Sequence, residues 1–168
     1  MGLMAQTVRN SSQREKEKMP VVKLGRRAVF PFHLAETNLT MPTKTIIKPA
    51  KSAPALGPYN HGVRVGDLLF CAGQIPIDPA HPNGPLPADI KAQTERVLEN
   101  IKLILEDQKL TFTNVVKSTV FLTNLADFAG MNEVYAKYFT GDFPARSTIQ
   151  VAALPKGANV EIEVVAHF

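Results

Sequence analysis

Residues 89–106 read DIKAQTERVLENIKLILE, and this stretch decides what kind of fold the chain can adopt. Its apolar side chains recur at three- and four-residue steps, with charged residues between them: Ile90, Val97, Leu98, Ile101, Ile104 and Leu105. That spacing predicts an amphipathic helix of about five turns. Because such a helix buries one apolar stripe, it needs another layer of structure to pack against.

Short strands are predicted on both sides of this helix. Before it, Val63 and Val65 precede the pair Gly66-Asp67, and residues 68–72 (LLFCA) follow, which indicates two strands joined by a tight turn. After it, residues 115–122 (VVKSTVFL) are rich in β-branched and aromatic side chains. The chain therefore combines a helix with strands that come before and after it.

The last part of the chain predicts a second helix and two more strands. Asn124, with Asp127 three residues later, can cap a helix that runs to Phe139, although Gly130 inside it costs about 1 kcal/mol relative to alanine. Strands are expected over residues 147–152 and 160–166, separated by residues 154–157 (LPKG). The prolines and the Asn-Gly pair of residues 79–85 (PAHPNGP) indicate a loop.

The order of these elements, β-β-α-β-α-β-β, predicts an α+β domain with both helices on one face of a sheet. In the final strand Val160, Ile162 and Val164 point to one side, whereas Glu161 and Glu163 point to the other. The helices cover only the apolar side. The uncovered face therefore needs another explanation, and association with other subunits is one.

Charge divides the 168-residue chain into a basic leader and a neutral body. Residues 1–42 hold seven of the 19 Lys and Arg but three of the 15 Asp and Glu, so residues 43–168 carry twelve of each. A neutral body lacks the basic surface that binding to RNA or DNA requires. We expect residues 43–168 to form one domain and nucleic acid not to be its partner.

The leader supports two interpretations. From residue 19 to residue 35 Lys23, Arg26 and Arg27 stand among apolar residues without an acid, which is typical of an organellar targeting segment. Glu15 and Glu17 weaken this interpretation, and a disordered tail is the alternative. Targeting predicts a mitochondrial protein, whereas translation that starts at Met41 predicts a cytoplasmic one. No run of eighteen apolar residues and no secretory signal occurs, so no membrane partner is expected.

Several classes of chemistry are excluded by the motifs that the sequence lacks. It contains no GxGxxG, GxxxxGK[ST], HExxH or GxSxG pattern. The four histidines are scattered, and no metal site is expected from them. The single cysteine, Cys71, excludes an internal disulfide and lies in an apolar run, which predicts a buried structural thiol.

Two charged residues and one aromatic residue remain as candidates for a site. Arg146 opens a short strand after residues 143–145 (FPA), where a guanidinium held as a fixed fork would suit a carboxylate. On spacing alone the structural interpretation, a pair with Glu161 or Glu163 or simple solvation, is preferred. Glu161 also has two interpretations: a solvated surface residue, or a partly desolvated carboxylate that holds a water. Tyr59 is either an ordinary aromatic residue of a turn or a lid over a pocket.

Five segments together resemble one known family over residues 44–168. They are residues 57–59 (GPY), 72–76 (AGQIP), 124–128 (NLADF) with Asn132, 143–147 (FPARS) and 160–163 (VEIE). In this order and approximate spacing the chain resembles the RidA/YjgF family, also called the liver perchloric-acid-soluble protein (L-PSP) family. The resemblance implies a chorismate-mutase-like fold and a homotrimer whose sheets face inward, with a site in each cleft between subunits.

The resemblance also implies roles for individual residues. Arg146 would bind the substrate carboxylate, and Glu161 would position or activate the attacking water. Further contacts to the substrate would come from the following residues: Tyr59, Ala72, Gly73, Asn132 and Thr148. Some family members have cysteine at position 148 and serine at position 72, so the resemblance implies main-chain contacts there and no thiol chemistry.

The activity that the resemblance implies is hydrolysis of 2-iminopropanoate and 2-iminobutanoate to a 2-oxo acid and ammonia. Neither a metal nor an organic cofactor is implied, because orientation of an electrophilic imine and one placed water can supply most of the acceleration. Two alternatives stay open. One is an RNA-directed translation inhibitor or endoribonuclease, and the other is a trimer that binds small ligands or acts like a chaperone without turnover.

Overall fold

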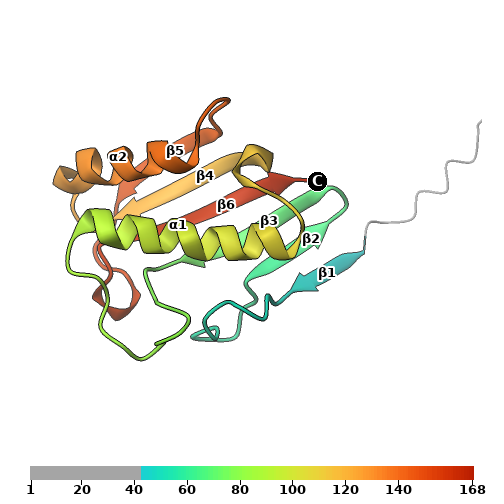
Figure 1. Ribbon diagram of the computed structural model, residues 1–168, viewed down its shortest axis with the longest axis horizontal. Helices are drawn as coiled ribbons and strands as arrows, with labels where there is room; N and C mark the ends of the chain where they lie inside the picture. Colours follow the sequence, from blue (N-terminus) through green and yellow to red (C-terminus); the bar gives the residue numbers. More distant parts are fainter. Residues whose placement is uncertain (1–42) are drawn as a thin grey trace, which may run out of the picture. The chain divides into compact units, whose positions relative to one another are not determined.

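Residues 43–168 are the part of the chain that the computed structural model describes, and the predictions for the leader, residues 1–42, lie outside it. These residues form one six-stranded sheet with strand order β1-β2-β3-β6-β4-β5 and two α-helices (Figure 1). The strands are β1 (Lys44–Ile47), β2 (Gly62–Val65), β3 (Leu68–Gln74), β4 (Val115–Leu122), β5 (Ala145–Gln150) and β6 (Val160–His167). The helices are α1 (Ile90–Asp107) and α2 (Phe128–Tyr138), with short 3-10 turns η1 (Phe112–Asn114), η2 (Leu125–Asp127) and η3 (Pro155–Gly157).

This architecture confirms the predicted α+β fold and adds one strand. The expected hairpin is present: β2 and β3 are antiparallel, and Gly66 at the turn between them has φ of 59°, a left-handed conformation that glycine adopts without strain. The additional strand is β1, which pairs antiparallel with β2 at the sheet edge. The sequence gives little sign of β1 because only Ile47 of its four residues is buried.

Helix α1 occupies the stretch that the apolar periodicity predicted. The Asp89 side chain accepts a hydrogen bond from the Ala92 N–H of 3.0 Å and so caps the first turn. The apolar stripe packs on β3 and β6 and lies in the main core. Its buried members are Val97, Leu98, Ile101, Ile104 and Leu105.

Helix α2 begins four residues after Asn124, later than predicted. The Asn124 side chain does accept a capping hydrogen bond, from the Ala126 N–H, but the element that it caps is the 3-10 turn η2. Gly130 lies where α2 crosses α1: a Cβ at this position would stand 2.9 Å from Cγ2 of Ile90. The glycine that weakened the helix prediction therefore allows the two helices to approach closely.

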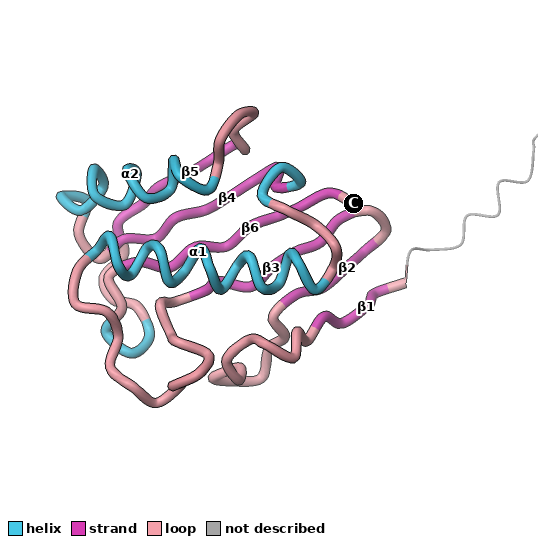
Figure 2. Tube along the Cα trace, viewed as in Figure 1, coloured by secondary structure: helices cyan, strands magenta, loops and turns pink. Residues whose placement is uncertain are grey.

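Both helices lie on the same face of the sheet, as Figures 1 and 2 show. On β6 the side chains of Val160, Ile162 and Val164 are buried beneath them, whereas those of Glu161 and Glu163 point to the other, open face. Strands β4 and β5 are parallel and are connected through α2, while β6 is antiparallel to both of its neighbours. Within residues 43–168 the sheet therefore has one packed face and one uncovered face.

The open face carries large apolar side chains among its charges. Ile46, Phe70 and Ile149 belong to rows of that face and are 41%, 46% and 47% exposed. Exposed apolar side chains that share a sheet face are typical of a surface that meets another protein.

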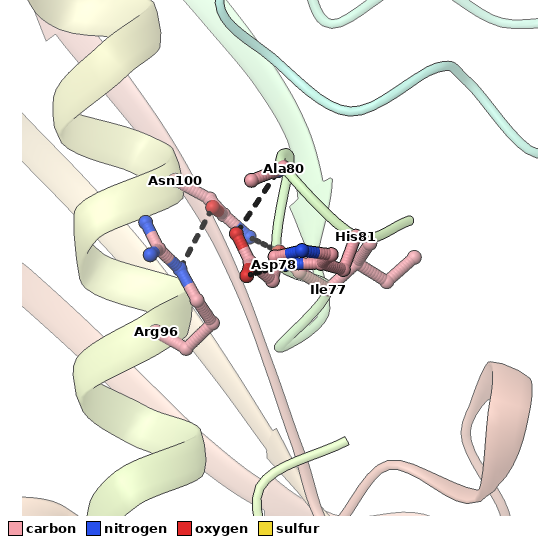
Figure 3. A network of polar contacts seen from close by, with 6 residues as sticks. All are labelled: Ile77, Asp78, Ala80, His81, Arg96 and Asn100. Atoms are coloured by element: carbon pink, nitrogen blue, oxygen red, sulfur yellow. Dashed lines mark hydrogen bonds and ion pairs between the residues drawn. The ribbon is translucent and has the colours of Figure 1, made fainter. Parts of the chain in front are cut away.

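The loop between β3 and α1 is held by a buried asparagine (Figure 3). Nδ2 of Asn100 donates to the carbonyl oxygens of Ile75 and Ile77 at 3.1 and 2.9 Å, while Oδ1 accepts from Nε of Arg96 at 3.1 Å. Within the loop Asp78 accepts hydrogen bonds from the Ala80 N–H and from the His81 ring, both at 3.0 Å. Asn100 thereby fixes the chain directly after β3, where one of the candidate pockets lies.

Within the described residues, no helix has both the length and the apolar character needed to cross a membrane.

Candidate active site

The Glu161 pocket is a cavity of about 440 Å³ beside the open face of the sheet, between β3, β6 and the loop that precedes β2. Its walls are mostly apolar, and Glu161 supplies the only carboxylate among its lining residues. Those residues are Leu56, Gly57, Tyr59, Ala72, Gly73, Ile75, Pro155 and Glu161. The fold thus gathers four of the predicted site residues, Tyr59, Ala72, Gly73 and Glu161, around one cavity.

Glu161 rests directly on Gly73. A Cβ at position 73 would overlap a carboxylate oxygen of Glu161 and would stand 2.8 Å from its Cδ, so any larger residue there must displace the carboxylate. Burial raises the pKa of the Glu161 carboxyl, and the nearby charge of Glu163 raises it further. A carboxylate in such surroundings is a stronger proton acceptor than an ordinary solvated glutamate.

Tyr59 and Ala72 belong to the wall of this pocket. The Tyr59 hydroxyl accepts a hydrogen bond from the Leu56 N–H of 3.2 Å, and its ring stands over Gly57. Tyr59 therefore stabilises a turn and also lines the pocket, and its role as a lid stays a prediction. The Ala72 N–H donates to the His61 carbonyl, and its carbonyl accepts from Nε2 of Gln74, which leaves a second lone pair of that oxygen available.

The Arg146 pocket is a second cavity, of about 410 Å³, between α2 and the start of β5. Nη2 of Arg146 donates a hydrogen bond of 2.8 Å to Oδ1 of Asn132, and the guanidinium carbon lies 4.5 Å from the centre of the Tyr135 ring. Within residues 43–168 Arg146 forms no ion pair. Of the two alternatives, the pair with Glu161 or Glu163 is therefore wrong, whereas a solvated Arg146 stays open. Within residues 43–168 most of the guanidinium donors have no protein acceptor.

The sequence assigned no role to Tyr135, which lines the Arg146 pocket, or to Ser118 and Phe128 close by. Tyr135 lies beneath the guanidinium, its hydroxyl shares a hydrogen bond of 2.7 Å with Oγ of Ser118, and Phe128 lies 5.7 Å from the guanidinium carbon. Asn132 and Tyr135 are three residues apart on α2, which places them on one helix face. This spacing could have indicated that Tyr135 lies near the Arg146 pocket, but a tyrosine in an apolar helix looks like an ordinary core residue.

Arg146 and Glu161 lie on opposite faces of the sheet. The cross-strand neighbour of Arg146 is Ser118, which points to α2, whereas the neighbour of Glu161 is Phe121, one residue out of phase with the buried side chains of β4. The two residues also line separate cavities. Within one chain the two pockets, which we call half-sites, are therefore separate.

Thr148 lines neither of these two pockets. It shares the α2 side of β5 with Arg146, and its Oγ1 is buried without a hydrogen-bond partner among the described residues. The role predicted for Thr148 is a contact from its main chain, and the position of the side-chain hydroxyl does not test that role.

Residues 43–168 contain neither a cluster of metal-ligating side chains nor an activated thiol. No three His, Cys, Asp or Glu side chains gather there in a way that could hold a metal ion. Cys71 is buried, as predicted, and burial raises its pKa to about 12, so the thiol stays protonated at neutral pH and is a poor nucleophile.

Comparisons with known proteins place the chain in a family. The family model described as Endoribonuclease L-PSP matches residues 50–168. Protein DfrA of Myxococcus xanthus is 52% identical over 67% of this chain and 86% of its own length. The 2-iminobutanoate/2-iminopropanoate deaminase of Capra hircus is 45% identical over 73% of this chain and 89% of its own.

A solved structure agrees with this placement. Escherichia coli TdcF, crystallised with bound serine, is 42% identical, and its structure matches 74% of this chain and 98% of its own with a TM-score of 0.69. The chain belongs to the L-PSP family, the RidA/YjgF family that the sequence resembles.

Proposed function

We propose that this protein hydrolyses 2-iminobutanoate and 2-iminopropanoate to 2-oxo acids and ammonia, in sites that form between subunits of a homotrimer. The observation that carries the proposal is the pair of half-sites. An arginine fork lies on one face of the sheet, and a partly desolvated carboxylate lies on the other. Each supplies one part of an imine hydrolase, and a second copy of the chain can bring them together.

Arg146 suits the carboxylate of an imino acid. One N–H of the guanidinium is used by Asn132, and the ring of Tyr135 supports its plane, so the remaining donors are held in a fixed fork. Binding of serine by the relative TdcF supports recognition of a small amino-acid-like ligand in this fold. Arg146 would thus hold the substrate with its C=N carbon in one place.

Glu161 suits the activation of water. Its raised pKa makes it a better base than a solvated carboxylate, and the surrounding apolar walls favour the small aliphatic part of the substrate. The carboxylate would accept a proton as water adds to the imine carbon, and ammonia would leave after proton transfer to nitrogen. The name of the Capra hircus relative supports this reaction class.

The homotrimer is proposed from the open face of the sheet. Apolar side chains such as Phe70 and Ile149 are exposed there, and Glu161 points to the same side. If the open faces of three copies meet, the Glu161 pocket of one subunit comes to the boundary with the next.

A direct test follows imine loss with purified protein while a threonine dehydratase generates 2-iminobutanoate. The wild-type chain should accelerate the loss well above the buffer rate. Arg146→Ala should reduce kcat/KM by roughly 100-fold or more, because a charge-assisted, bidentate contact to the reacting molecule is lost. Arg146→Lys should restore little, because an ammonium cannot form the fork.

Arg64→Ala is the matched control. Arg64 is also stacked on an aromatic ring, 3.6 Å from the centre of Phe168, and donates to a carbonyl, but it lines neither pocket. Its removal should leave kcat/KM within about two-fold of wild type. Absence of any protein-dependent rate, or full activity of Arg146→Ala, would refute the proposal.

An RNA-directed activity is the second candidate, favoured by the family's description as Endoribonuclease L-PSP. Equal numbers of basic and acidic residues in residues 43–168 count against it, because RNA binding draws on an excess of positive charge. Incubation of purified protein with labelled single-stranded RNA separates the two. Cleavage that follows the protein through a further chromatographic step would favour this candidate, and cleavage lost at that step would exclude it.

A further inference from the structure

The residues beneath Arg146 form a stack that no predicted role explains. Ser118 is fully buried on β4 and is the direct cross-strand neighbour of Arg146 on β5. Tyr135 of α2 contacts both of them: its hydroxyl lies 2.7 Å from Oγ of Ser118, and its ring centre lies 4.5 Å from the guanidinium carbon of Arg146. A polar pair is thus buried in the core directly beneath the cation.

The Tyr135 ring is itself held from several sides. It is stacked on Phe139 with a centroid distance of 4.2 Å, and Phe139 meets Phe112 edge-on at 4.9 Å. Tyr135 is only 4% exposed. The hydroxyl is fixed by Ser118 and the ring by aromatic packing, so the surface that Tyr135 offers to Arg146 has little freedom to move.

We infer that Tyr135, oriented by Ser118, is a positioning residue that fixes the guanidinium of Arg146 from below, while Asn132 fixes it from the side. The ring lies against the guanidinium, with its centre 4.5 Å from the guanidinium carbon, and the hydrogen bond to Asn132 holds Nη2 at 2.8 Å. Two contacts of different direction leave the unused N–H donors aimed at the Arg146 pocket. The inference rests on the proposed role of Arg146 as a carboxylate clamp.

This arrangement accounts for a polar pair in the core. A buried hydroxyl is costly unless it is satisfied, and Ser118 and Tyr135 satisfy each other. Burial raises the pKa of the Tyr135 hydroxyl, which keeps it protonated, whereas the hydrogen bond to Ser118 and the charge of Arg146 act in the opposite direction. Two apolar residues could fill the same space, but they would lack the hydrogen bond that helps to fix the aromatic ring at one point.

The first test observes Arg146 in the free protein and requires no substrate. Its side-chain Nε–Hε signal can be assigned in nitrogen-15 spectra as the one that disappears in Arg146→Lys. Wild type should show a restrained signal with slow hydrogen exchange, and Tyr135→Leu should make it mobile and faster to exchange. An unchanged signal in Tyr135→Leu would overturn the inference even if the protein proved to have no deaminase activity.

The second test measures KM and kcat for the imine, with the affinity for 2-oxobutanoate as a check. Tyr135→Phe and Ser118→Ala should each raise KM roughly 3- to 10-fold, as expected for loss of one hydrogen bond, with a smaller effect on kcat. Ser118→Thr, which keeps the hydroxyl, should restore KM. The double variant Ser118→Ala/Tyr135→Phe removes both polar partners, so no buried group is left unsatisfied. It replaces the single variants in this test if either of them folds poorly.

Tyr138→Phe is the matched control, because Tyr138 is also on α2 and its hydroxyl donates a 2.8 Å hydrogen bond, but to Glu99 and away from Arg146. It should leave KM unchanged. In the Arg146→Ala background, Tyr135→Phe should add no further loss, because Tyr135 acts through the arginine. Equal losses in the two backgrounds would show an independent, merely structural role and overturn the inference.

Discussion

The charge on Glu161 depends on a neighbour that lines neither candidate pocket. Glu163 lies two residues along the same strand, on the same open face, and its charge adds to the effect of burial in raising the Glu161 pKa. In the proposed mechanism Glu161 can accept a proton only when it is itself deprotonated. Activity should therefore fall on acidification through a pKa that is higher than the ordinary value of a glutamate.

Glu163→Gln should move this acid limb to lower pH. The substitution removes the repulsion between the two carboxylates and leaves the larger cause, burial, in place, so the shift is only part of the total. A profile of kcat/KM against pH measures it. Glu133→Gln is the control, because Glu133 is exposed and paired with Lys91 at 2.6 Å. A limb that stays in place or moves upward in Glu163→Gln would contradict this role of Glu161.

Gly73→Ala tests the room beneath Glu161. The added Cβ overlaps the carboxylate, which is the mobile end of a long side chain, so the fold can yield while the carboxylate shifts aside. Activity should drop by about 10-fold or more, since misplacement of a reacting group by about 1 Å is expensive. The melting temperature should change little. Unaltered activity would mean that the position of Glu161 is not critical.

The sequence indicated which residues could act but not how they are arranged. Arg146 and Glu161 stand in recognisable segments, and the alternation on β6 predicted correctly that Glu161 leaves the core. The side to which Arg146 points could not be predicted, because β5 (ARSTIQ) is an edge strand without a clear apolar side. Ser118 and Tyr135 looked like ordinary strand and core residues, because their function depends on a contact between distant parts of the chain.

At the level of elements, long amphipathic segments were predictable and short edge segments were not. Helix α1 has five turns of apolar periodicity, and its limits agree with the structure. The strand β1 buries one side chain, and the start of α2 was displaced because Asn124 caps a 3-10 turn first. A cap residue indicates that a helical turn begins, but not whether that turn is 3-10 or α.

The crossing of the two helices leads to a prediction about Gly130. Gly130→Ala should gain about 1 kcal/mol of helix propensity but forces a Cβ to 2.9 Å from the branched Ile90, and such overpacking costs about 1–3 kcal/mol. We expect net destabilisation in chemical denaturation. Ile90→Leu, which lacks the Cγ2 group, should reduce the penalty in the double variant when compared with Ile90→Leu alone. Stabilisation by Gly130→Ala would show that the helices can separate without cost.

For the whole molecule, the separation of the half-sites is the decisive feature. Within one chain the sheet lies between Arg146 and Glu161, so the two side chains face different sides of the molecule. If a site needs both residues, each site must take Arg146 from one subunit and Glu161 from its neighbour. Loss of one residue in one subunit can then be compensated by the intact residue of another.

Complementation between two inactive variants measures this most directly. Arg146→Ala and Glu161→Gln chains would be purified separately, mixed in equal amounts, unfolded and refolded together, and assayed for 2-iminobutanoate hydrolysis, with mass spectrometry to verify mixed oligomers. Random assembly gives about a quarter of the interfaces an intact Arg146 facing an intact Glu161, so about a quarter of wild-type activity should return. Mixed oligomers that form but remain as inactive as either parent would contradict a shared intersubunit site.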